Sequence, residues 1–312
     1  MTAFTESLPS VEPMLRAKSG DVRGQGSQSG LPSRFLLPSN HLPASIRCLI
    51  EIARPYEGAE PMATAATMPA VSASQRSAFL RWVAKHFYFV MSLLIAAIVV
   101  YAFSHTVGDR LIHAVPRRPL LLWVHGIVFS AWVAFYILQS ALVRLRKVAL
   151  HRTLGWIGAA LGAAVILVGF RVPVVMAQFA ITYLHREADA ARAFLAIPFL
   201  DMVTFTICFA LAVLWRTKPE LHRRLMLIAT CALTAAAFGR MNMIRSIPPL
   251  GFYFGVDGLI LLGAVRDLVV NRRIHPVYWT AIPLLVPAQA AAVYIAGHQS
   301  AFWLRFMNRL IA

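Results

Sequence analysis

The stretch LLWVHGIVFSAWVAFYILQSALVRLRKVALHRTLGW, residues 121–156, holds an apolar run with one histidine near its start, a short basic loop, and a second histidine that opens another apolar run. The same order of features returns twice: from Asp201 to the histidine of WRTKPELHRRLML, and from Asp257 to the histidine of RDLVVNRRIHPVYW. Self-similarity of this kind indicates a structural unit that recurs along the chain. The sequence therefore predicts repeated hairpins of two apolar helices.

The composition favours a membrane protein, because 59% of the residues are apolar and only 14% are charged. Apolar runs of about 17–25 residues match the ~30 Å hydrocarbon core of a bilayer. We expect an all-α polytopic transmembrane bundle of about seven helices. Their approximate bounds are 86–104, 119–143, 153–177, 194–215, 224–246, 250–270 and 278–297. The sixth is interrupted by Asp257, Arg266 and Asp267, so six spans are the alternative.

Residues 1–67 form a different kind of segment, rich in proline, serine and glycine and without helical or strand periodicity. Such a segment lacks the apolar surface that offsets the entropy of ordering, so we expect a disordered tail. Its acids and bases balance, which argues against an Arg-rich transit peptide. A start codon at Met68 is the alternative to a translated tail. The predicted transmembrane domain is 68–312.

The net charge of +17 consequently falls on residues 68–312. In a soluble protein such a charge would suggest nucleic acid, but in a membrane protein basic residues mark the cytoplasmic loops. Most of them lie near the N-terminal end of the first span and in the loops around 144–152, 216–224 and 266–273. We therefore expect the lipid bilayer, and no nucleic acid, as the partner, with the N-terminus inside and the C-terminus outside.

Five ionisable residues are expected in one outer layer of the bundle. At 1.5 Å per residue, His125, Asp201 and Asp257 lie roughly 9–12 Å below the outer boundary, and Arg171 and Arg240 reach nearly the same depth from the other side. Ionisable groups at such depth usually face a protein interior or a water-filled cavity. We expect the arginines to neutralise the aspartates and the layer to form a substrate or proton site. The alternative is that the arginines extend to the headgroups and the aspartates are structural.

Three histidines mark the opposite layer, since His151, His222 and His275 each stand at the start of a predicted helix. The positive end of the helix dipole disfavours their protonation, and neutral imidazole is the form that binds a metal or haem iron. Small residues from Gly155 onward would let a helix or a flat porphyrin approach closely. The alternative is that these histidines contact lipid headgroups. The three histidines are therefore candidate cofactor ligands.

Five segments carry a resemblance to a family of uncharacterised bacterial multi-pass membrane proteins. They are LLWVHGIVFSAWVAFYILQSALV, VALHRTLGWIGA, KPELHRRLMLIAT, AFGRMN and RRIHPVYW, and the resemblance covers essentially residues 80–305. It implies a helical bundle in the bacterial inner (plasma) membrane. It supplies no activity.

A weaker similarity connects the chain to cytochrome b561-type membrane proteins, in which an HG helix and a following HR helix contribute haem ligands. This similarity implies ligand roles for His125 and His151. No other histidine lies at the depth of His125 within a predicted helix, however. His222 does match the depth of His151 on a parallel helix, so we expect at most one haem b, held by His151 and His222 near the cytoplasmic face.

Three hypotheses follow. The first is a redox protein with a haem and with a quinone or polar small molecule in the outer layer. The second is a small-solute or proton-coupled transporter that uses the outer layer and needs no cofactor. The third is a non-catalytic scaffold or assembly factor whose polar layers fix helix register. We favour the first, because the histidines at helix starts are the most sharply repeated feature.

Overall fold

The computed structural model describes residues 73–241 and 251–311, and within them every regular element is a helix. The predicted tail, 1–67, lies outside the described residues. The helices are α2 (Ala73–Ser104), the π-helical turn η2 (Gly108–Ile112), α3 (Leu120–Arg144), α4 (Val148–Leu184), α5 (Ala188–Phe194), α6 (Ala196–Leu214), α7 (Pro219–Ala232), α8 (Ala235–Phe238), α10 (Gly251–Asn271), α11 (Pro276–His298) and α12 (Ala301–Ile311). The predicted all-α bundle is confirmed.

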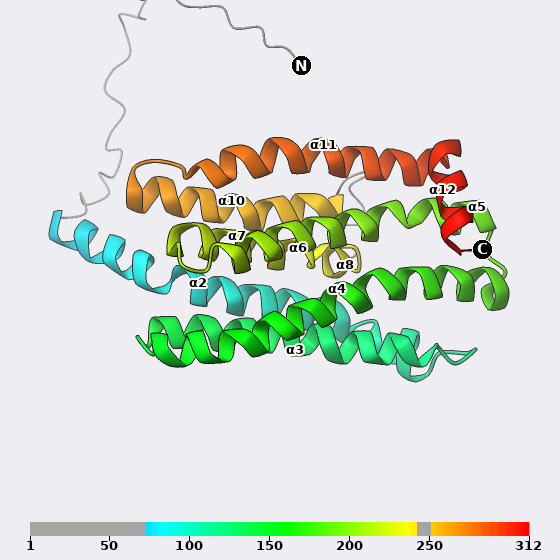
Figure 1. The fold of residues 1–312 in the computed structure, drawn as a ribbon, viewed down its shortest axis with the longest axis horizontal. Helices are drawn as coiled ribbons and strands as arrows, with labels where there is room; N and C mark the ends of the chain where they lie inside the picture. Colours follow the sequence, from blue (N-terminus) through cyan, green and yellow to red (C-terminus); the bar gives the residue numbers. More distant parts are fainter. Residues whose placement is uncertain (1–72, 242–250, 312) are drawn as a thin grey trace, which may run out of the picture. The chain divides into compact units, whose positions relative to one another are not determined.

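Six helical segments are long and apolar enough to cross a membrane. They are Ser77–Ser104, Leu120–Arg144, Val148–Leu184, Ala188–Leu214, Pro219–Phe238 and Pro276–His298. The 21-residue α10 lies alongside them (Figure 1), and its three charged residues, Asp257, Arg266 and Asp267, interrupt its apolar run, as the sequence indicated. The bundle therefore has six spans by length and composition, and α10 as a seventh long helix.

Short turns connect the helices into hairpins at one end of the bundle. Figure 1 shows the α3–α4, α6–α7 and α10–α11 turns at the same end, which we call the histidine end because His151, His222 and His275 lie there. The level where α8 terminates, short of the opposite end formed by α5 and α12 (Figure 1), is called the Arg240 end. Whether the three hairpins are copies of one ancestral unit stays a prediction.

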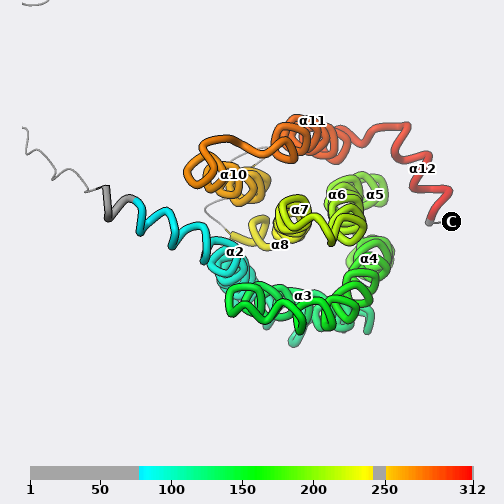
Figure 2. The backbone as a smooth tube through the Cα atoms, turned by 60° about the vertical axis from the view of Figure 1, so that its left-hand side comes forward, coloured from blue at the N-terminus to red at the C-terminus, as the bar shows by residue number. Residues whose placement is uncertain are grey.

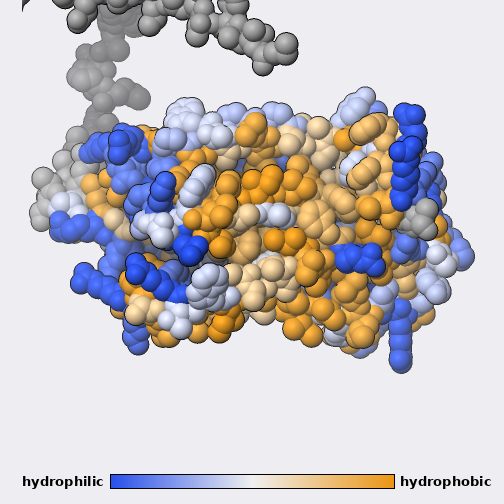
Figure 3. Space-filling view, viewed as in Figure 1, coloured by the Kyte–Doolittle hydropathy of each residue, from blue (hydrophilic) through white to orange (hydrophobic). Residues whose placement is uncertain are grey.

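The outer surface of the bundle is apolar across its middle. Figure 3 shows hydrophobic side chains over the central part of the visible face and hydrophilic ones gathered mainly at the two ends. Large apolar side chains such as Ile127, Leu167 and Leu284 are about 70% exposed. Monomeric soluble proteins rarely expose such a large continuous apolar surface. The chain is accordingly an integral membrane protein whose exposed apolar middle suits contact with lipid.

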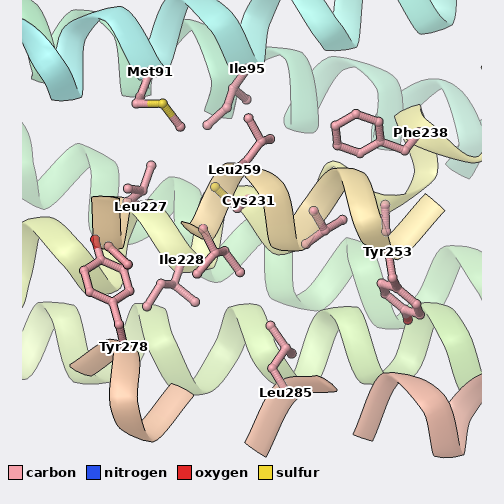
Figure 4. Close-up of a cluster of buried hydrophobic side chains, with 14 of the residues drawn as sticks. Met91, Ile95, Leu227, Ile228, Cys231, Phe238, Tyr253, Leu259, Tyr278 and Leu285 are labelled. Carbon is pink, nitrogen blue, oxygen red and sulfur yellow. The ribbon is translucent and has the colours of Figure 1, made fainter. Parts of the chain in front are cut away.

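Helix α7 is the centre of the bundle. Two thirds of its span is buried (67%), whereas the other five spans are 11–28% buried. Figure 2 shows α7 between α2, α6, α10 and α11, and it packs against all four. Its residues Leu227, Ile228 and Cys231 belong to one buried hydrophobic cluster with Met91 and Ile95 of α2, and Figure 4 shows Ile228 on the side of Leu285 of α11.

The small face of α4 admits aromatic side chains. A Cβ atom at Gly158 would lie 2.6 Å from Cε1 of Phe135, and one at Gly162 would lie 2.2 Å from Cζ of Phe209. These glycines therefore let rings from α3 and α6 approach the α4 backbone. The predicted porphyrin-sized surface is occupied by phenyl rings at both positions.

A buried ion pair joins α7 to α10. Arg224 donates from Nε to Oδ2 of Asp267 at 2.6 Å and from Nη2 to Oδ1 at 2.7 Å. Both side chains are at most 1% exposed. Arg266 and Asn271 also donate to Oδ1 of Asp267, and Glu220 accepts from Nη1 of Arg224. The charges of Arg266 and Asp267, near the C-terminal end of α10, are thus neutralised inside the protein.

The C-terminal helix α12 was not expected from the sequence. Met307 is fully buried and Trp303 donates from Nε1 to the backbone oxygen of Arg192, whereas Phe302 and Leu310 are exposed. Its basic residues, Arg305 and Arg309, are four residues apart and so share one face of the helix. Figure 1 shows α12 running across the direction of the long helices. This amphipathic pattern fits a helix that lies in the membrane interface.

The ion pair leads to an asymmetric prediction. Asp267→Leu leaves two buried arginines, Arg224 and Arg266, without their carboxylate, so we expect a loss of about 3–5 kcal/mol in unfolding free energy. Arg224→Met should cost less, because Asp267 keeps its bonds from Arg266 and Asn271. Thermal unfolding in mild detergent measures both. Asp189→Leu, which removes an exposed pair with Arg192, is the control and should cost at most about 1 kcal/mol. A larger loss for Arg224→Met than for Asp267→Leu would contradict this account.

Candidate functional site

Two of the predicted cofactor ligands lie side by side. His151, in the first turn of α4, and His222, in the first turn of α7, have ring centroids 6.2 Å apart and ring planes inclined by 76°. Each helix begins just after a short turn at the histidine end, which brings residues that are far apart in sequence to the same depth. We call these two residues the histidine pair.

The tautomer of His222 is set by a backbone group. Its Nδ1 lies 2.8 Å from the carbonyl oxygen of Ala212, in the last turn of α6. A carbonyl oxygen can only accept, so Nδ1 carries the proton and Nε2 holds the lone pair. Histidines that bind metals commonly make this hydrogen bond through the nitrogen that does not bind the metal. The arrangement leaves Nε2 of His222 as the nitrogen able to ligate.

Open space lies one turn along α4 from the other member of the pair. Nδ1 of His151 is buried and has no hydrogen-bond partner among the described residues. At Gly155, one helical turn farther on, nothing lies within 4 Å of the position that a Cβ atom would take. The face that is filled by phenyl rings at Gly158 and Gly162 is therefore open at Gly155.

The third histidine has a different role in the structure. His275 is the N-cap of α11, and its Nδ1 accepts a hydrogen bond from the backbone N–H of Val277 at 3.2 Å. The charges that act on it come from Arg224, Asp267 and other members of the ion cluster of α7 and α10. The structure thus places His275 beside that cluster and does not show its ring against the histidine pair.

The two aspartates of the outer layer have neutral partners. Asp201 accepts a hydrogen bond from the hydroxyl of Tyr253 at 3.0 Å, and Asp257 accepts one from Nε2 of Gln289 at 3.0 Å. Gln289 is buried. These bonds connect α6 to α10 and α10 to α11. Among the described residues, neither aspartate lies within ion-pair distance of an arginine.

The other three residues of that layer separate into two groups. Arg171 is exposed on the surface of α4. Arg240 donates to the backbone oxygen of Ala236, and its guanidinium lies 4.2 Å from the ring centre of Phe103. Its charge also acts on the half-buried imidazole of His125, whose buried Nδ1 has no partner among the described residues. The expected Asp–Arg pairs therefore do not form in the described part of the chain, because equal depth on two helices does not imply that their side chains face each other.

Sequence reasoning overlooked several polar partners. Tyr253 and Gln289 hold the aspartates, and Arg224 with Asp267 forms the ion pair. A usable signal existed for Asp267, since an acid inside an apolar span needs a partner. Nothing in the sequence identified that partner as Arg224 rather than another of the basic residues at the same end.

The histidine pair offers two imidazole side chains from two different helices. Within residues 73–241 and 251–311, no three histidine, cysteine or acidic side chains gather in a way that could hold a metal ion. Haem iron needs only axial ligands from the protein. No protein-family model, curated protein or solved structure matches this chain. The function is therefore inferred from the chemistry of the site.

The His275 cap makes stability depend on pH. Burial lowers the pKa of His275 below its ordinary value, and the positive charge of Arg224 acts in the same direction. The folded protein therefore favours the neutral imidazole. The resulting stabilisation is complete above the ordinary pKa of about 6.5 and is lost as pH falls through the lowered folded pKa.

We expect the unfolding temperature of the wild-type protein to fall between about pH 7 and pH 5, and this part of the fall to disappear in His275→Asn, which keeps a capping side chain that does not titrate. Thermal unfolding at a series of pH values measures the effect. His298→Asn is the matched control and should keep the wild-type dependence. An unchanged pH profile in His275→Asn would show that the cap does not titrate in this range.

Proposed function

We propose that the chain is a membrane-embedded electron-transfer protein that holds one b-type haem between His151 and His222. The observation that carries this proposal is the 6.2 Å separation of their ring centroids. Imidazole rings at this separation would hold one haem iron between them, and the haem would supply a one-electron carrier. The pair comes from two different helices, so the protein clamps the site from both sides.

The surroundings of the pair support ligation. The carbonyl of Ala212 fixes the tautomer of His222 and leaves Nε2 available. Gly155 leaves room beside His151 for a flat group. These residues would hold and orient the haem.

The proposal also covers the small molecule that the protein binds and the orientation of the chain in the membrane. The Arg240 end, with the Asp201–Tyr253 and Asp257–Gln289 bonds, offers polar groups that could hold a quinone or another polar small molecule. The basic loops at the histidine end support its placement on the cytoplasmic side of the bacterial inner membrane. The same rule supports an N-terminus inside and a C-terminus outside.

The haem proposal is tested by a reduced-minus-oxidised absorbance spectrum of the full chain, purified in mild detergent from haem-replete cells. We expect a b-type spectrum in the wild type and its loss in His151→Ala and in His222→Ala, because one axial ligand is then missing. His275→Ala is the matched control, since it removes a histidine at the same end that does not contact the pair, and it should keep the spectrum. A colourless wild-type protein, or a spectrum that survives both substitutions in the pair, would overturn the assignment.

A second candidate, a proton-coupled carrier, is favoured by one specific observation. Asp201 and Asp257 lie inside the bundle with hydrogen bonds from neutral side chains only, among the described residues. Carboxyl groups in such positions mark proton relays in pumps and transporters. This function needs no haem, so a colourless preparation would make it the leading proposal.

The carrier proposal predicts that at least one of the two aspartates binds and releases a proton. The infrared C=O band of a protonated carboxyl group should appear as pH is lowered and should decrease in Asp201→Asn or Asp257→Asn. Asp189→Asn, at the exposed start of α5, should leave the band unchanged. If neither interior substitution alters the carboxyl bands, these aspartates are not the proton site.

A further inference from the structure

One face of α3 carries a row of polar side chains with no partners. His125, Trp132 and Gln139 are spaced by seven residues, which places them above one another on the same face of a helix. The buried atoms Nδ1 of His125, Nε1 of Trp132, and both Nε2 and Oε1 of Gln139 have no hydrogen-bond partner in the described part of the structure. We call these three residues the α3 row.

The α3 row extends from the level of Arg240 to the histidine end. At one end lies Arg240, whose charge acts on His125 and whose Nε is likewise buried without a partner among the described residues. At the other end, the ring of His151 lies near the backbone of Gln139. From His125 to Gln139 the helix rises about 21 Å. That distance is most of the ~30 Å hydrocarbon core.

The middle of the row is remote from bulk water and from lipid headgroups. Trp132 is 2% exposed. Its ring meets Phe205 and Phe209 of α6 edge-on, at centroid distances of 5.2 and 5.6 Å. Its indole N–H therefore lies between α3 and α6, inside the bundle. No protein nitrogen or oxygen atom among the described residues pairs with this N–H, so a small molecule that enters the protein is a candidate partner.

The energetics require such partners. Each buried polar atom left without a hydrogen bond costs a sizeable fraction of the stability of a whole domain, so several together would rival that stability. Trp132 can only donate, whereas Oε1 of Gln139 can only accept. An anion suits the first atom and a cation suits the second. Water suits both, because each molecule donates and accepts.

We propose that a chain of water molecules lies along the α3 row and forms a path for protons between the Arg240 end and the His151–His222 pair. Successive side chains of the row are about 10 Å apart along the helix, a distance that three or four waters at about 2.8 Å can bridge. A proton entering at one end is accepted by the first water, each water passes on one proton, and one proton leaves at the far end. The path does not depend on haem, so it goes beyond the proposed function.

The side chains of the row have distinct tasks in this path. The imidazole of His125 can accept and release a proton and so forms an entrance at the Arg240 end. Trp132 and Gln139 do not exchange protons with the chain as acids. They orient neighbouring waters, Trp132 by donating and Gln139 by donating and accepting.

Hydrogen exchange of the Trp132 indole tests the water chain directly. The full chain is labelled with ¹⁵N-tryptophan and ¹⁵N-leucine, placed in lipid nanodiscs and transferred to D₂O, and the Trp132 signal is identified by its loss in Trp132→Phe. A hydrated row should let this N–H exchange orders of magnitude faster than the backbone amide of Leu227, which lies in the core of α7. Exchange as slow as that amide would show a dry interior and overturn the proposal.

Blocking substitutions separate a water path from local opening of the helix. His125→Leu combined with Gln139→Leu removes the polar groups on both sides of Trp132 and should slow its exchange severalfold. Ser130→Leu is the matched control, because it makes a similar polar-to-apolar change on the exposed side of α3, and should have no effect. Fast exchange that is unaffected by the double substitution would indicate local opening and overturn the water path.

Proton movement is measured separately. In proteoliposomes with an internal pH dye, an imposed pH gradient should decay severalfold faster with the wild-type protein than with the His125→Leu/Gln139→Leu variant. Equal decay rates would overturn the role in proton conduction. Neither measurement requires a chromophore. A colourless protein would therefore refute the haem proposal and leave the water path standing. A b-type spectrum with slow exchange at Trp132 would support the haem proposal and overturn the water path.

Discussion

The buried bond between Arg224 and Asp267 is the constraint on which the rest of this structure depends. It joins the central helix α7 to α10, whose apolar run is interrupted by three charged residues. Isolated charges in hydrocarbon are costly, but a bidentate pair supported by Arg266 and Glu220 has its hydrogen-bonding groups largely satisfied. The pair therefore allows α10 to lie inside the bundle and fixes its depth against α7.

The depth of α10 in turn determines both polar layers. Near its start, Tyr253 reaches Asp201 on α6, and one turn farther on Asp257 meets Gln289 on α11. Near its end, the ion cluster lies beside His275, which caps α11. A sliding of α10 along α7 would break these contacts together. One ion pair thus sets the register of three helices.

The bundle handles its interior polar groups in three physically different ways. The cluster around Asp267 neutralises opposite charges, and the outer aspartates accept hydrogen bonds from neutral side chains. The α3 row has neither kind of partner within the described protein. The first two arrangements stabilise the fold by themselves. The α3 row instead needs water or another small molecule as its hydrogen-bond partner. Because the row ends beside the histidine pair, the proposed electron site and the proposed proton path meet at His151.

The amino-acid sequence by itself determined the helical class and the approximate places of the long apolar helices, although the single helix expected over 224–246 is divided into α7 and α8. Long apolar runs separated by basic turns predict membrane helices, and a constant rise per residue places His151 and His222 at one level. The eleven-residue α12 was missed because it is shorter than a span, although the spacing of Phe302, Phe306 and Leu310 was a usable signal.

Only the tertiary structure decided which residues face one another. Depth along a helix follows from counting, but rotation about the helix axis follows from packing, which depends on many side chains at once. For this reason Arg171 faces outward, the aspartates bind Tyr253 and Gln289, and phenyl rings fill the small face of α4. The same packing brought the two histidine rings to 6.2 Å, a distance that no residue count contains.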